Sequence, residues 1–102
     1  MKELKICAKL RFYDLSENQN IQKRKFENKL IVDFLVREDM YSSGQIILQN
    51  KDYAYPGEND VFAIIKFPHG KLLSSYVEAG KRFIFGEIGF PYGEGNIIEI
   101  IE

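Results

Sequence analysis

Cys7 and His69 are the two side chains in the sequence with the chemistry of a nucleophile or a general base. A catalytic cysteine needs a base beside it, and a histidine that binds a metal needs further ligands. Neither residue has such a partner at a recognisable spacing. The glutamates near the C-terminus, Glu87 and Glu94 among them, form no paired-carboxylate or metal motif. We therefore expect a protein that is not an enzyme, has no metal or nucleotide cofactor, and keeps these glutamates on a solvated face.

Six basic side chains in the first quarter of the chain are the best candidates for contact with nucleic acid. They are Lys5, Lys9 and Arg11 on one face of an alternating stretch, followed by Lys23, Arg24 and Lys25. Three aromatic residues, Phe26, Phe90 and Tyr92, are candidates for stacking on bases beside them. The net charge of -1 creates no global positive field. RNA binding by this local basic patch is therefore the alternative to a plain charged and solvated strand face.

Apolar side chains also fall on positions that face away from the expected core. On this alternation the sequence places Ile31, Leu35, Ile47, Phe62, Ile64 and Ile84. An apolar surface that stays exposed marks a contact with a partner or a dimer. Ile31 and Leu35, together with Phe90 and Tyr92, are the residues that we assign to a protein interface.

Strands must position all of these side chains, because the apolar residues recur with a period of two. The clearest case is Leu4–Phe12, where every even position is apolar. The same reasoning predicts the five further strands 30–37, 45–49, 61–67, 82–85 and 96–101. Six strands separated by turn signals favour an all-β protein, and we expect a closed six-stranded antiparallel β-barrel formed by a single domain, residues 1–102.

Glycine and proline mark the expected turns between these strands. Ser42-Ser43-Gly44 predicts a turn ahead of the strand at 45–49, and Pro56-Gly57 predicts a tight reversal in which glycine accepts a positive φ. The run from Gly86 to Gly95 lacks a following helix that would hold a phosphate. It is therefore interpreted as a corner of the barrel.

The second half of the chain carries a pattern of motifs in a set order. These are Tyr55-Pro56-Gly57-Glu58-Asn59, then a β run, then Glu78-Ala79-Gly80-Lys81-Arg82-Phe83, and finally Gly93-Glu94-Gly95 before an aliphatic strand. The pattern resembles the third, C-terminal β-barrel domain of translation elongation factor Tu and its relatives. The resemblance implies a barrel of that kind as a free-standing domain.

Three departures separate the sequence from that family. The chain has no Gly-x-x-x-x-Gly-Lys-Ser/Thr loop for GTP. Phe90 stands where the family has an arginine of a basic segment near its transfer RNA contacts, and the family's Gly-Tyr-Arg-Pro run is replaced by Glu27-Asn28-Lys29-Leu30. We therefore expect a protein-interaction module with a translation-related partner, or a mimic of the factor, rather than a carrier of transfer RNA.

The N-terminal segment and the cysteine count bear on location. Charges are interleaved through Met1–Lys5, where a signal peptide needs an apolar stretch, and a single cysteine cannot form an intramolecular disulfide. No apolar run approaches the ~20 residues that a spanning helix requires. The sequence therefore predicts a cytoplasmic protein that does not enter the membrane.

Overall fold

A computed structural model of the chain describes residues 3–14, 26–37, 40–68, 78–87 and 90–101. Within these residues the protein is all-β. The strands are β1 (Leu4–Phe12), β2 (Phe26–Glu27), β3 (Leu30–Arg37), β4 (Met40–Leu48), β5 (Tyr53–Ala54), β6 (Val61–Phe67), β7 (Arg82–Glu87) and β8 (Phe90–Ile100).

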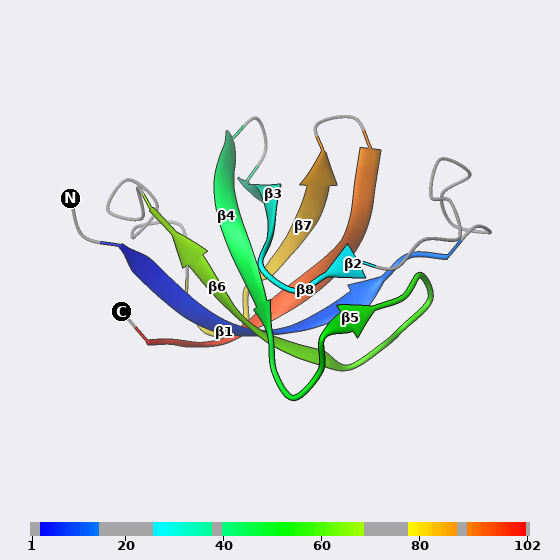
Figure 1. Cartoon of the computed structure of the whole chain (residues 1–102). Helices are drawn as coiled ribbons and strands as arrows, with labels where there is room; N and C mark the ends of the chain where they lie inside the picture. Colours follow the sequence, from blue (N-terminus) through cyan, green and yellow to red (C-terminus); the bar gives the residue numbers. More distant parts are fainter. Residues whose placement is uncertain (1–2, 15–25, 38–39, 69–77, 88–89, 102) are drawn as a thin grey trace.

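Six of these strands close into an antiparallel barrel, as the sequence predicts. Their order around the barrel is β1-β6-β4-β3-β7-β8, and β8 pairs with β1 to complete the ring. Figure 1 shows β8 curving through the molecule from its pairing with β7 to its pairing with β1. Closure pairs β1 with a strand on each side, so the barrel has no free terminal strand.

The core fills the inside of the barrel because alternate residues of every strand point inward. β1 and β6 bury every second residue, from Ile6 to Phe12 and from Val61 to Phe67. At the centre the ring of Phe34 packs against Phe67, Phe83 and Phe85, with ring centroids 5.1, 5.6 and 6.1 Å away. Since these rings come from β6 and β7, which are opposite each other in the strand order, the aromatic cluster joins opposite walls of the barrel.

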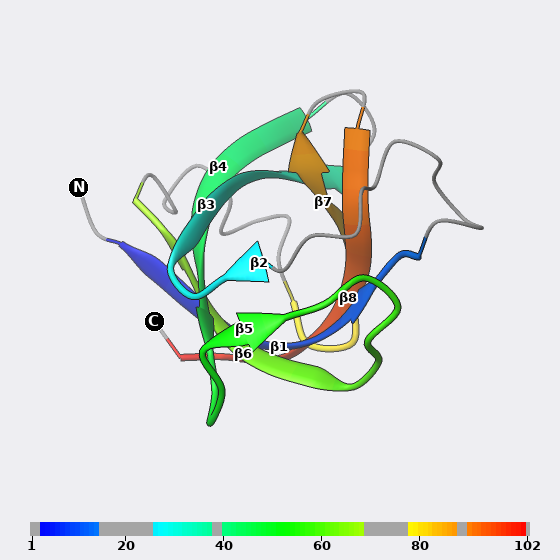
Figure 2. The ribbon, with the colours of Figure 1, turned by 45° about the vertical axis from the view of Figure 1, so that its right-hand side comes forward.

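A two-stranded sheet formed by β2 and β5 was not predicted from the sequence. Phe26 pairs with Ala54, and both are buried. The Phe26 ring lies 4.9 Å from that of Phe12 and 5.1 Å from that of Tyr92. In Figure 2, where the barrel strands appear as a ring, β2 and β5 lie across it. The prediction that Phe26 stacks on bases is therefore wrong, because its ring is part of the core.

Two segments that the sequence assigns to turns are strands in the structure. Ser42, Ser43 and Gly44 lie within β4 and pair with β3. A Cβ atom at Gly44 would lie 2.9 Å from the Phe34 ring and 3.0 Å from the Phe67 ring, so this small residue makes room for the core. The expected corner at 86–95 is likewise wrong for Phe90–Gly95, which belong to β8.

The predicted reversal at Pro56-Gly57 is confirmed. Gly57 has φ +88°, and its N–H donates to the carbonyl of Phe12 at 3.0 Å. Gly93 has a different role, because a Cβ there would lie 2.2 Å from the backbone oxygen of Arg11. The glycine in β8 therefore permits β1 and β8 to lie side by side at the seam where the barrel closes.

Candidate binding groove and charged depression

A groove of about 180 Å³ lies on the outer face of the barrel where β3, β4, β7 and β8 come together. The groove lies near the ends of β3 and β7 and the starts of β4 and β8, which are at the top of Figure 1. We call it the Leu35 groove, and its lining residues are Asp33, Leu35, Tyr41, Ile84, Phe85, Gly86, Glu87 and Pro91.

Strand register brings the apolar part of the groove together. Leu35 pairs with Tyr41 on one side and with Ile84 on the other, so three outward side chains from three strands form one row. They face outward because their neighbours in sequence, including Phe34 and Phe85, fill the core. Tyr41 is 44% exposed, whereas Leu35 and Ile84 are partly covered. The row gives the groove an apolar floor with an aromatic wall.

Two carboxylates, those of Asp33 and Glu87, line the same groove. On β4, Ser43 donates a hydrogen bond from Oγ to Asp33 Oδ1 at 3.3 Å, and on β7 the residue paired with Asp33 is Gly86, which has no side chain. Glu87 accepts a hydrogen bond from the Tyr92 hydroxyl at 2.7 Å. Among the described residues, neither carboxylate forms an ion pair. Both therefore carry negative charge to the groove without an ion pair to any side chain that the structure describes.

The four residues assigned to a protein interface from the sequence have different positions. Leu35 lines the groove, and Phe90, 49% exposed, pairs with the groove residue Glu87. Ile31 is 70% exposed and lies on the same outward face of β3 as Leu35. Tyr92 is only 8% exposed and packs against Phe26, so its assignment to an exposed surface, or to base stacking, is wrong. Its hydroxyl reaches the groove only through Glu87.

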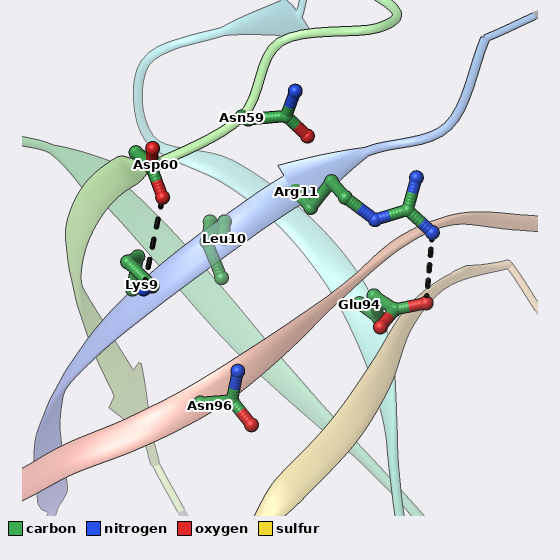
Figure 3. Close-up of a pocket in the computed structure, with 7 residues that line it drawn as sticks. All are labelled: Lys9, Leu10, Arg11, Asn59, Asp60, Glu94 and Asn96. Carbon is green, nitrogen blue, oxygen red and sulfur yellow. Dashed lines mark hydrogen bonds and ion pairs between the residues drawn. The ribbon is translucent and has the colours of Figure 1, made fainter.

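A second hollow of about 210 Å³ lies over β1 and β8, and we call it the charged depression. Figure 3 shows its lining residues, which are Lys9, Leu10, Arg11, Asn59, Asp60, Glu94 and Asn96. The ammonium of Lys9 lies 3.6 Å from the Asp60 carboxylate, and the guanidinium of Arg11 lies 3.0 Å from that of Glu94. The cations of this hollow are thus paired within the protein.

Glu94 is the centre of a cluster that the sequence analysis did not predict. Its Oε1 atom accepts from Arg11 at 3.0 Å, from Arg82 at 2.8 Å and from the Tyr13 hydroxyl at 3.2 Å. The Arg11 guanidinium also lies 5.1 Å from the centre of the Tyr13 ring. With 20% of its side chain exposed, Glu94 is not the solvated residue that we expected. We call Tyr13, Arg11, Arg82 and Glu94 the Glu94 cluster.

The surroundings of this cluster change the acidity of two groups. Partial burial of Glu94 raises its pKa, but hydrogen bonds and attraction from Arg11 and Arg82 outweigh burial, so the pKa lies below its usual value. The pKa of Tyr13 is raised, first by burial and then by the charge of Glu94 and the hydrogen bond to it. Near neutral pH the cluster therefore holds a carboxylate and an un-ionised phenol.

The predicted RNA-binding residues fall into two groups. Lys5, Lys9 and Arg11 lie on the outer face of β1, and each has a carboxylate nearby: Glu3 at 3.8 Å from Lys5, Asp60 from Lys9 and Glu94 from Arg11. Lys23, Arg24 and Lys25 lie outside the described residues, as does His69. Cys7 is partly covered on β1, where it pairs with Ile64 and Glu99. The described part of the chain contains no group of three or more potential metal ligands.

Tyr41 and Arg82 are two of the residues that sequence reasoning missed at the two sites. Arg82 was read only as part of a strand, and its partner Glu94 lies on β8. Tyr41 was not assigned a face, because the strand at 45–49 was predicted to begin after it. A longer β4 would have placed Tyr41 on the same outward alternation as Ser43 and Gln45.

Comparison with models of known protein families and with curated proteins gives no match to this chain. Within the described residues, no helix has the length and apolar character needed to cross a bilayer.

Proposed function

We propose that this chain is a non-enzymatic binding module that holds a protein partner in the Leu35 groove. One observation carries the proposal: the apolar row of Leu35, Tyr41 and Ile84 lines a groove beside two carboxylates that form no ion pair with a described side chain. Exposed apolar surface bordered by polar groups is typical of an interaction site. Ile31 and Phe90 extend the apolar surface beyond the groove.

The size of the groove supports a peptide-like occupant over a cofactor. Sites for small molecules usually enclose roughly 300 to 1,000 Å³. The groove has about 180 Å³, which suits one or two side chains of a partner. Its lining, with aliphatic and aromatic residues in the middle and carboxylates among them, has the organisation of a protein contact.

The proposal also concerns the identity of the partner. The resemblance of Tyr55–Asn59, Glu78–Phe83 and Gly93–Gly95 to the elongation factor barrel supports a translation-related partner, or one that normally binds that factor. A closed barrel of six antiparallel strands is consistent with this ancestry. A cytoplasmic location is part of the same proposal.

Affinity capture with matched variants tests the proposal. Tyr41→Ser and Leu35→Ser should reduce recovery of a specific partner at least tenfold, because they remove the apolar contacts of the groove. Phe62→Ser is the control, since Phe62 is 48% exposed on β6 and lies opposite Lys9, outside the groove. Recovery that falls equally in all three variants, or in none, contradicts the proposed site. The recovered protein then tests whether the partner belongs to translation.

RNA binding is the second candidate, and one observation favours it. Arg82 and Lys9 flank Asn96 on opposite sides, and the charged depression and the Glu94 cluster together contain three cations, Lys9, Arg11 and Arg82, against two carboxylates, Asp60 and Glu94. The excess is one positive charge. If RNA binds here, Arg82→Ala weakens binding at low salt and reduces its salt dependence. Electrophoretic shift assays with structured RNA measure this, and an absence of binding at low salt excludes it.

A further inference from the structure

We infer that the occupant of the Leu35 groove is a basic peptide segment, with one apolar side chain on the Leu35–Tyr41–Ile84 row and a lysine or arginine beside it for Asp33 and Glu87. The inference rests on the proposed function, because it names the chemistry of the partner at the same site. It follows from the charges that line the groove rather than from its shape.

Among the described side chains that line the groove, every charged residue is acidic. Asp33 and Glu87 contribute two negative charges, and no lysine or arginine is among the lining residues. The opposite arrangement holds over β8, where the carboxylate of Glu94 binds two guanidiniums. If the partner carried no charge, both groove carboxylates would lose bound water on binding and would gain no ion pair in return. A partner with a cation next to its apolar side chain avoids that loss and gains attraction.

The carboxylate of Asp33 is open to a partner because of its neighbours. Across β4 it meets the hydroxyl of Ser43, which donates a single long hydrogen bond, and across β7 it meets Gly86. A Cβ at Gly86 would lie 2.5 Å from the backbone nitrogen of Tyr92, so this position accepts no side chain without movement of β8. Position 86 therefore carries no side chain that could bind the Asp33 carboxylate.

A second copy of the chain is a poorer occupant than a basic peptide. A two-fold contact through this groove would place Asp33 and Glu87 of both copies close together, and like charges in a shared interface cost free energy. Among the described residues, the most exposed cation with a printed partner, Arg82 at 63%, already contacts Glu94. Charge complementarity therefore favours a partner of opposite charge.

Selection of displayed random heptapeptides against the full chain tests the inference, with prior depletion on the Tyr41→Ser variant. The expected peptides combine an aliphatic or aromatic residue with lysine or arginine one or two positions away. Synthetic copies should shift the amide resonances of Leu35, Tyr41 and Ile84 in the isotope-labelled protein. Their affinity should fall roughly two- to fivefold for each of Asp33→Asn and Glu87→Gln, the size expected for an exposed ion pair.

The two substitutions keep the oxygens that Ser43 and Tyr92 donate to, so folding is preserved and only charge changes. Added salt should weaken binding to the wild type more than to the double variant. Peptides that bind the groove without lysine or arginine, with affinity unchanged in the double variant, overturn the inference and leave the proposed function intact. Failure to enrich any peptide over the Tyr41→Ser variant, or concentration-dependent dimerisation through the groove, overturns both.

Discussion

The charged depression and the Leu35 groove lie on the outside of one barrel and differ in how their charged groups are partnered. In the depression, Lys9 and Arg11 each lie within 3.6 Å of a carboxylate, and Glu94 serves Arg82 as well. In the groove, the described partners of Asp33 and Glu87 are hydroxyl donors. The ion pairs of the depression join β1, β7 and β8, whereas the groove combines carboxylates with apolar surface, the combination on which the proposed partner site rests.

A cluster of basic residues in the sequence is therefore not enough to predict a binding surface. Lys5, Lys9 and Arg11 drew attention as a basic patch, yet each has a carboxylate within 3.8 Å. Desolvating such a pair for an outside ligand gains little, because the ligand replaces an existing partner. The proposed groove rests instead on two carboxylates, Asp33 and Glu87, that form no ion pair with a described side chain.

The largest expected effect comes from Gly86, the glycine beneath the groove. Gly86→Ala places a Cβ 2.5 Å from the backbone nitrogen of Tyr92 at φ +146°, and we expect a loss of about 2 to 4 kcal/mol in the free energy of unfolding. Gly80→Ala is the control, since Gly80 also has a positive φ, +89°, but has nothing within 4 Å. It should cost about 1 kcal/mol. If urea unfolding gives equal losses of stability for Gly86→Ala and Gly80→Ala, the close contact between position 86 and β8 adds nothing to the cost.

Glu94 gives the next largest effect and tests the structural role of the charged depression. Glu94→Gln leaves Arg11 and Arg82 beside a neutral amide, and we expect a loss of about 1 to 2 kcal/mol, reduced by the exposure of both arginines. Glu99→Gln, an exposed residue of the same strand, should change stability by less than about 0.5 kcal/mol. Thermal unfolding measures both variants. If Glu94→Gln is as stable as wild type, the ion pairs of the charged depression do not stabilise the barrel, and the contrast with the Leu35 groove is lost.

The strands and the barrel were predictable from the sequence where alternation is regular. The predicted bounds of Leu4–Phe12 and Val61–Phe67 are confirmed, because both strands bury every second residue. Alternation failed at Ser42–Gly44, where small residues in β4 make room for Phe34 and Phe67. That requirement is set by side chains from other strands, so no local pattern in the sequence reports it.

The sites were less predictable than the fold for the same reason. Arg11 and Glu94 are 83 residues apart in the chain, and their contact depends on the pairing of β1 with β8. Leu35 was assigned correctly to the outer face, but Tyr41 and Ile84 become its neighbours only through the register of β3 with β4 and β7. Alternation within a strand predicts which residues face outward. It does not predict which of them are in contact across two strands, because that depends on the register.

The smallest predicted effect is the change with pH in the contribution of Glu94 to stability. Because Arg11 and Arg82 hold the pKa of Glu94 below 4.5, its ordinary value, ionised Glu94 stabilises the folded state. That contribution is complete above about pH 5 and is lost as the pH falls through the lowered pKa. The difference in unfolding free energy between wild type and Glu94→Gln should therefore be constant from about pH 7 to 5 and shrink at lower pH. Urea titrations of both proteins at each pH measure this difference, and a difference that stays the same below about pH 5 contradicts the structural role of the Glu94 carboxylate.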